Sequence, residues 1–307
     1  MMNDTMSTNC IDDMLITVFT PTYNRAALLS RLYEGLCEQP FEIFEWLVVD
    51  DGSTDNTLDV INGYKAEAKF PIRYFRQGNG GKHRAINRGI DEARGELFFI
   101  ADSDDCLAPG ALKKVKAVYE SVATDRRFAG VVGLDETFDG ALIGSALPYD
   151  MIDCSAIDIR LKYHVTGDMK EVFRTSVLKE FRFPEFYGER FCPEALVWNR
   201  IAQKYKLRYF NKAIYVADYL LDGLTQRIVR IRMESPMAST THYSELNSYA
   251  VPTMQKLKAA INYWRFWYCL RDKSMAPHLP EVWHLVKPLG WLMHRRDLRG
   301  LAVQSQR

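Results

Sequence analysis

The stretch WLVVDDGSTDNT at residues 46–57 decides the fold. Residues 46–50 form a short apolar run, which is typical of a buried strand. The polar letters that follow form a loop with helix-capping side chains, and Leu58, Ile61 and Tyr64 then recur at the spacing of one helical face. The stretch therefore predicts a strand, a loop and a helix in succession.

The same unit recurs on both sides of this stretch. Apolar, strand-like runs occur at ITVFT (16–20), IRYF (72–75) and LFFI (97–100), and each is followed by a polar or Gly-rich loop and a helical pattern. A further strand-like run, FAGVVGL, occupies residues 128–134. Strands that alternate with helices predict an α/β fold with a parallel sheet covered on both faces.

The loops after the first four strands carry unusual chemistry. They read PTYNR, DDGSTDNT, GNGGKHRA and DSDD. Ligands of such sheets bind where loops leave the carboxyl ends of the strands, so we expect the four loops to converge on one crevice. In the last loop, Asp102, Asp104 and Asp105 crowd three carboxylates into four positions, and like charges this close oppose one another's ionisation. A cation, a helix end or open water must balance them.

Composition narrows the class of protein. The chain has 307 residues, 47% of them hydrophobic, and a formal charge of +1, which argues against a general nucleic-acid binder. Residues 252–307 contain ten Lys or Arg and three Asp or Glu, a formal +7, so the remainder carries −6. The six cysteines show no zinc-like spacing, and we find neither a signal peptide nor a run of about 18 apolar residues. A cytoplasmic protein is expected.

The four loop motifs carry a resemblance to a known family. TPTYNR, VVDDGSTDNT, NGGKHRAINRG and ADSDD, in this order, resemble the nucleotide-sugar-binding half of family-two glycosyltransferases with the GT-A fold, and the match covers about residues 14–225. The resemblance implies a Rossmann-like, mostly parallel sheet flanked by helices, with a helical C-terminal extension. It implies a catalytic domain over 1–251, with a nucleotide-sugar half at about 14–135 and an acceptor half at about 136–225. A basic, aromatic tail over 252–307 follows.

The resemblance assigns the acidic loop to a metal ion. Asp102 and Asp104 would form a D-x-D motif around Ser103 on the donor side, with Asp104 as a direct ligand of Mn²⁺ or Mg²⁺. Two carboxylates spaced in this way can share a hard cation, and the cation stabilises the charge that develops on a departing diphosphate. Asp105 would support this pair or cap the helix that starts near Pro109.

The resemblance also assigns the donor pocket. Asp51 would read the nucleotide base, and the residues that would line its pocket are Thr20, Pro21, Tyr23 and Arg25. The residues that would hold the diphosphate or ribose are Lys82, His83 and Asn87. A solvated basic loop is the alternative for these last three.

The acceptor side is assigned to a helix that we expect to begin at Pro193. Glu194 lies in its first turn, where the family has an acidic pair and one carboxylate acts as general base. Here the pair is written Pro-Glu, so Glu194 matches, and Glu189 is an alternative base. Glu194 as a simple helix stabiliser also remains open. Asp222, in YLLDGLT (219–225), could touch the metal or the diphosphate or mark a turn.

Four of the six tryptophans lie in the basic tail, and they are Trp264, Trp267, Trp283 and Trp291. Aromatic and cationic side chains on short helices suit the headgroup level of an anionic membrane, and packing on the protein is the alternative. The family resemblance as a whole implies an inverting, metal-dependent hexosyltransferase that uses a UDP-sugar and a saccharide or lipid-linked saccharide acceptor, and we expect it in the cytoplasm or on the inner face of the membrane. A sugar nucleotidyltransferase and a non-catalytic nucleotide-sugar-binding partner are the alternatives.

Overall fold

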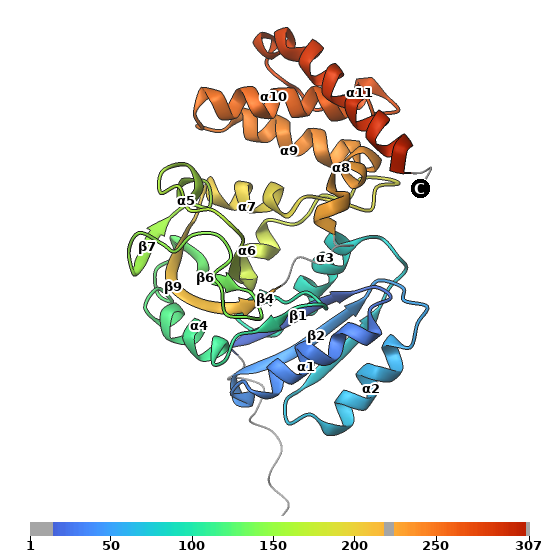
Figure 1. Ribbon diagram of the computed structural model, residues 1–307. Helices are drawn as coiled ribbons and strands as arrows, with labels where there is room; N and C mark the ends of the chain where they lie inside the picture. Colours follow the sequence, from blue (N-terminus) through green and yellow to red (C-terminus); the bar gives the residue numbers. More distant parts are fainter. Residues whose placement is uncertain (1–14, 218–223, 305–307) are drawn as a thin grey trace, which may run out of the picture. The chain divides into compact units, whose positions relative to one another are not determined.

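The computed structural model describes residues 15–217 and 224–304 (Figure 1). By contact density the chain forms two compact units, which we call the first and second unit. Of the described residues, the first comprises 15–79, 85–182 and 201–217, and the second comprises 80–84, 183–200 and 224–304. The chain passes between them within two helices, α3 (Lys82–Glu92) and α7 (Glu194–Ala202). The expected division into a catalytic domain and a tail from residue 252 stays a prediction.

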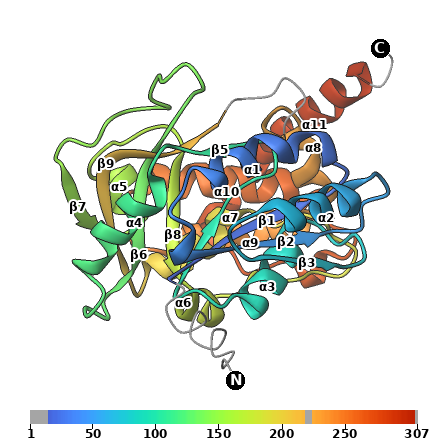
Figure 2. The same ribbon diagram turned by 90° about the horizontal axis from the view of Figure 1, so that it is seen from below.

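The first unit is built on one twisted sheet, and the first half of this sheet is parallel (Figure 2). The strand order here is β3-β2-β1-β4, and each neighbouring pair runs in the same direction. All four apolar runs predicted from the sequence are strands, namely β1 (Ile16–Thr22), β2 (Phe44–Asp50), β3 (Ile72–Arg76) and β4 (Leu97–Ile100). Their carboxyl ends lie along one edge, which brings their loops together.

Beyond β4 the sheet becomes mixed. Strand β8 is inserted antiparallel between β4 and β6, and β9 continues parallel to β6. Two short strands pair antiparallel with β9. The strands of this half are β5 (Cys106–Leu107), β6 (Phe128–Glu136), β7 (Met151–Cys154), β8 (Met169–Arg174) and β9 (Lys206–Val216). The sheet is therefore mostly parallel only in its first half.

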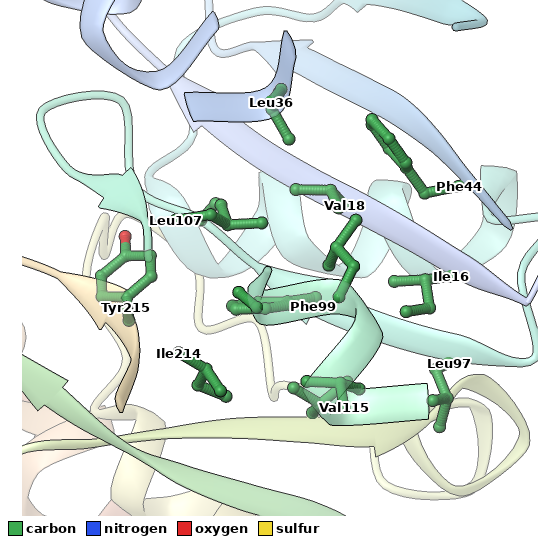
Figure 3. Packing of buried hydrophobic residues seen from close by; sticks show 14 of the residues in the cluster. Ile16, Val18, Leu36, Phe44, Leu97, Phe99, Leu107, Val115, Ile214 and Tyr215 are labelled. Carbon is green, nitrogen blue, oxygen red and sulfur yellow. The ribbon is translucent and has the colours of Figure 1, made fainter. Parts of the chain in front are cut away.

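Side chains of alternate strand positions fill the two faces of the sheet. On one face Val18 and Phe99 pack with Leu36 of α1 and Val115 of α4 (Figure 3). On the other face Gly89 of α3 lies against the ring of Phe19, where a Cβ would sit 2.2 Å from a ring carbon. The remaining helices and turns of this unit are η1 (Ala26–Leu28), α1 (Leu29–Cys37), η2 (Phe41–Ile43), α2 (Thr57–Glu67), α4 (Ala111–Glu120), α5 (Asp158–Leu161) and α6 (Thr175–Glu180).

The second unit is helical. Its elements besides the starts of α3 and α7 are α8 (Leu224–Glu234), α9 (Pro236–Ser248), α10 (Thr253–Trp267), η3 (Lys273–Met275), η4 (Glu281–Val286) and α11 (Lys287–Gln304). An apolar cluster of Ala260, Tyr263, Trp264 and Leu279 is centred on α10, with Trp267 and Trp283 packed against it. Three of the four tail tryptophans thus have a packing role, whereas Trp291 is 45% exposed. Among the described residues, no helix is long and apolar enough to cross a membrane.

Candidate active site

The loops after β1 and β2 are fastened to each other. The backbone N–H of Asn24 donates to Ser53 Oγ at 2.9 Å, and the N–H of Thr54 donates to Asn24 Oδ1 at 2.7 Å. The N–H of Ala26 donates to Asp55 Oδ2 at 3.0 Å. Asn24 adopts a left-handed conformation with φ of 51°, which asparagine tolerates better than most residues. PTYNR and DDGSTDNT therefore converge, as the topology predicts.

The two aspartates that end β2 have different partners. Asp50 is buried, accepts a hydrogen bond from the Tyr74 hydroxyl at 2.5 Å and accepts the N–H of Ser53 at 2.7 Å, so it shapes the loop. Asp51 accepts hydrogen bonds from Gln77 Nε2 at 2.8 Å and Asn79 Nδ2 at 3.2 Å. These amides come from the loop after β3, so a third loop joins the same edge. They hold the Asp51 carboxylate in one orientation.

The first and last loops meet through an ion pair. Arg25 Nη1 lies 2.5 Å from Asp104 Oδ2, with side-chain exposures of 32% and 20%. Tyr23 in the same loop is 46% exposed, so its ring is available to a ligand. Thr20 and Pro21 are buried within β1, and Thr20 Oγ1 accepts a hydrogen bond from the Trp46 indole at 2.9 Å. The Thr20 hydroxyl thus stabilises the sheet from inside.

The acidic loop is held by a tyrosine from the far half of the sheet. The backbone N–H of Asp102 donates to Tyr215 Oη at 2.7 Å, and that hydroxyl donates to Asp105 Oδ2 at 2.9 Å. Lys170 of β8 lies over the ring of Tyr215, 3.5 Å from its centroid. Burial, followed by the neighbouring charge of Asp102, raises the pKa of Asp105 to about 7. Asp105 therefore acts as an anchor of the loop, and negative charge accumulates around it.

The residues of this loop fit a hard divalent cation. Their donors are carboxylate oxygens, which Mg²⁺ and Mn²⁺ prefer. Within the described residues no group of three or more His, Cys, Asp or Glu side chains forms a metal centre. In proteins Mg²⁺ is usually held by one or two carboxylates together with water and substrate phosphates. Ser103 is buried between the two candidate ligands, Asp102 and Asp104.

In the second unit the Gly-rich loop meets the start of α7. Lys82 Nζ lies 2.9 Å from Glu194 Oε1, and the two side chains are 31% and 38% exposed. Gly81 permits the approach, because its φ of +98° favours glycine and an added Cβ would lie 1.9 Å from the carbonyl oxygen of Arg190. Arg84 strengthens the contact through Glu185, 3.2 Å away. The candidate base is thus paired with a candidate phosphate-binding cation.

The two remaining candidates on α3 are less accessible than expected. His83 is 3% exposed and Asn87 is 6% exposed. Their positions in the first two turns of the helix leave little of either side chain open to a ligand in this conformation. Asp222 lies outside the described residues.

Glu189 has a structural position. Its side chain is buried and accepts the backbone N–H groups of Met237 at 2.6 Å and Ala238 at 2.9 Å, in the first turn of α9. These N–H groups have no partner within the helix, so the carboxylate caps it. Burial raises the pKa of Glu189, although these two hydrogen bonds act in the opposite direction. The geometry favours Glu194 over Glu189 as the accessible carboxylate.

Sequence reasoning missed Tyr215, Lys170 and the amides of Gln77 and Asn79. Nothing in the strand NKAIYV marks Tyr215, because its role depends on a partner 110 positions away. Gln77 and Asn79 had a usable signal, since they begin the loop after a predicted strand and carry amide donors beside an acidic loop.

The architecture of the first unit defines a GT-A fold. The chain superposes on S. aureus TarS 1-349, solved in complex with UDP-GlcNAc, with a TM-score of 0.61, 19% identity and coverage of 92% of this chain and 90% of that one. It also superposes on the mannosyltransferase PcManGT from Pyrobaculum calidifontis, solved with GDP-Man and Mn²⁺, with a TM-score of 0.57, 16% identity and coverage of 96% and 89%. These likenesses establish the fold.

Sequence comparison establishes the family. The protein family described as "Glycosyl transferase family 2" matches residues 17–131 of this chain. The chain is 31% identical to the GalNAc(5)-diNAcBac-PP-undecaprenol beta-1,3-glucosyltransferase of Campylobacter jejuni. The match extends over 232 residues and covers 70% of each protein. It is 28% identical over 179 residues to the poly(ribitol-phosphate) beta-N-acetylglucosaminyltransferase TarS of Staphylococcus aureus, covering 56% of this chain and 30% of TarS. The chain belongs to glycosyltransferase family 2 and is an enzyme of that class, which argues against both alternatives.

Proposed function

We propose that this enzyme transfers a hexosyl group from a UDP-sugar to a hydroxyl of a cell-envelope saccharide or lipid-linked saccharide, with inversion at the anomeric carbon. The main support for a donor-binding site is the Arg25–Asp104 contact, which joins the first and fourth loops at the carboxyl edge of the parallel strands. Asp51, oriented by two amides, supports recognition of the base, since a carboxylate accepts hydrogen bonds from a uracil N–H. The named relatives support an envelope acceptor.

Asp102 and Asp104 would hold Mn²⁺ or Mg²⁺. When bound, such an ion supplies electrostatic stabilisation of the diphosphate as it leaves. Arg25 adds a second positive charge beside Asp104, and a guanidinium is well suited to phosphate oxygens. Tyr23, exposed in the same loop, would stack on the base.

Glu194 would act as the general base. It accepts the proton of the acceptor hydroxyl while the hydroxyl oxygen attacks the anomeric carbon and the bond to the diphosphate breaks. Its side chain is partly exposed and lies in the first turn of α7. Lys82 fixes its orientation in the absence of ligand.

The enzyme would work in the cytoplasm, at the inner face of the membrane. The relative from Campylobacter jejuni is named for an undecaprenol-linked substrate, and a lipid-linked acceptor of that kind would lie at a bilayer surface. The excess of positive charge in residues 252–307 would favour contact with anionic lipid.

A donor screen tests the proposal. The purified chain is incubated with UDP-glucose, UDP-GlcNAc, UDP-galactose and GDP-mannose, with Mn²⁺ or with EDTA, and release of the nucleoside diphosphate is measured. We expect slow hydrolysis of at least one UDP-sugar, and its loss with EDTA. Release of pyrophosphate from a sugar phosphate and UTP, with no cleavage of any UDP-sugar, would contradict the proposal.

A further inference from the structure

One face of helix α11, which we call its inner face, packs against α10. Gly290 packs against α10, where a Cβ would lie 2.4 Å from the Cβ of Trp264. Four residues on, His294 Nδ1 lies 3.7 Å from Cys269 Sγ, and Asp297 pairs with Arg265 at 2.5 Å. Positions i, i+4 and i+7 share one helical face, so these contacts fix which side of α11 meets the protein. Figure 1 shows α11 lying beside α10.

The opposite face of η4 and α11 is apolar at its start and cationic further along. Leu285 at the end of η4 is 82% exposed, and Leu289 and Leu292 of α11 are 49% and 55% exposed. The same row continues with Arg296 and Arg299, both exposed. Flanking this row are Val282, Trp291, Arg295 and Leu298, all exposed. We call these nine residues the outer face of α11.

This outer face is unusual for a protein surface in water. Of the sixteen large apolar side chains exposed in the described residues, six lie between positions 282 and 298. Single exposed apolar residues need no explanation, but a contiguous patch marks an interaction site. The contacts of α11 with α10 come from Gly290, His294 and Asp297, and none of them uses the exposed apolar side chains, so the patch is in excess of what these contacts require.

The charges of the outer face identify its partner. Arg295, Arg296 and Arg299 lie beside the apolar row, and the one acidic residue at this end of α11, Asp297, is neutralised by Arg265 on the inner side. The guanidinium of Arg295 is 5.8 Å from the Trp291 ring centroid, and tryptophan with arginine suits the headgroup level of a bilayer. An apolar row that sinks into acyl chains, bordered by arginines that pair with phosphate, is the pattern of a helix lying in the membrane plane.

We propose that the outer face of α11 docks on an anionic lipid bilayer, with Leu285, Leu289 and Leu292 entering the headgroup boundary and the three arginines contacting lipid phosphates. The proposal rests on the proposed function only for its biological reason, a lipid-linked acceptor. Of the four tail tryptophans only Trp291 belongs to this membrane contact, because Trp264, Trp267 and Trp283 pack within the second unit.

Vesicle flotation tests this face directly. The full chain is mixed with phosphatidylcholine vesicles, or with vesicles containing about a third phosphatidylglycerol, at low and physiological salt. Each arginine near such a surface contributes about 1 kcal/mol, so we expect Arg295→Gln/Arg296→Gln/Arg299→Gln to weaken partitioning to anionic vesicles about a hundredfold. Leu285→Ser/Leu289→Ser/Leu292→Ser should weaken it at least tenfold.

The matched control is Met254→Ser/Lys258→Gln, which removes an exposed apolar and an exposed basic residue from α10 of the same unit. It should float like the parent. Hydrolysis of the UDP-sugar by the free enzyme should be unchanged in all three variants, so a failure of flotation is distinguishable from a failure of the proposed function. A parent that does not float on anionic vesicles at low salt would overturn the proposal. A second result would also overturn it. The parent would be a dimer, the leucine variant a monomer, and both would float equally well on anionic vesicles.

Discussion

Replacing Glu194 or Glu189 by glutamine tests which of these two residues acts as the general base and which caps a helix. Glu194→Gln keeps the size of the side chain and removes its proton-accepting charge. The ion pair with Lys82 that this change breaks is partly exposed, and such pairs contribute about 0.2–1 kcal/mol. General-base catalysis contributes about 10²–10⁴ in rate. We therefore expect transfer to fall at least a hundredfold, with the melting temperature within a few degrees of the parent.

Glu189→Gln should give the opposite pattern. The buried carboxylate accepts two backbone N–H groups of α9, and a neutral amide offers one oxygen and turns an NH₂ group toward a donor. Leaving a buried donor without its acceptor costs about 1–3 kcal/mol. The melting temperature should fall by several degrees, at about 2–4 °C per kcal/mol for a chain of this size class, and turnover of the folded fraction should stay within a few-fold of the parent.

The assay combines steady-state transfer, calorimetric UDP affinity and thermal melts for both variants. Lys82→Gln is the control for the ion pair, because it breaks the same contact and leaves the carboxylate in place. If the rate loss came from the broken pair, Lys82→Gln would reproduce it at saturating donor. Transfer by Glu194→Gln within about threefold of the parent at saturating donor, together with collapse in Glu189→Gln, would refute the assignment of the base.

Three further predictions follow from the described contacts. Asp104→Asn should weaken Mn²⁺-dependent UDP binding at least tenfold in calorimetry, because an amide cannot replace the charge of a carboxylate on a divalent ion, and unchanged affinity would remove Asp104 as a ligand. Gly81→Ala should lower stability by about 1–3 kcal/mol in urea melts, because its φ of +98° and the carbonyl of Arg190 leave no room for a Cβ, and a neutral effect would mean that the loop can shift. Burial, with the charge of Arg232 as a second cause, lowers the pKa of His242 to about 3, so the unfolded state binds the proton first. Stability should therefore fall by up to about 1.4 kcal/mol per unit as pH drops from about 6 toward 4, and His242→Leu should flatten this slope whereas the exposed His278→Leu should not.

The parallel half of the sheet could be predicted because its information is local. Strands buried on both faces read as continuous apolar runs, and β2 or β4 needs no knowledge of distant residues to be recognised. The helix after PTYNR and the helix after DGSTDNT follow in the same way. The convergence of the first and second loops could also be anticipated from topology, and the Asn24–Ser53 and Thr54–Asn24 hydrogen bonds confirm it.

The mixed half of the sheet could not be predicted, because the pairing of its strands depends on residues far apart in the sequence. Strand β8 enters between β4 and β6, and its letters MKEVFR carry no mark of that partner choice. The same holds for Glu189, whose buried carboxylate caps a helix that begins 47 positions later at Pro236. Such pairings depend on long-range packing, and the contacts of Glu189 favour Glu194 as the accessible carboxylate of the two.

The membrane contact proposed for the C-terminal tail depends on which residues share the outer face of α11, and not on the composition of the tail alone. Its basic charge and its tryptophans were visible in the sequence, but both packing and membrane contact remained compatible with them. The row of Gly290, His294 and Asp297 faces α10, so the residues about half a turn away must face outward. Leu285, Leu289 and Leu292 are exposed on this outward side at 82%, 49% and 55%, so a partner that buried them would gain part of the about 1.5–3 kcal/mol that complete burial of such a side chain contributes. A surface that keeps this apolar area exposed beside three arginines is therefore better explained by an anionic bilayer than by the needs of the fold.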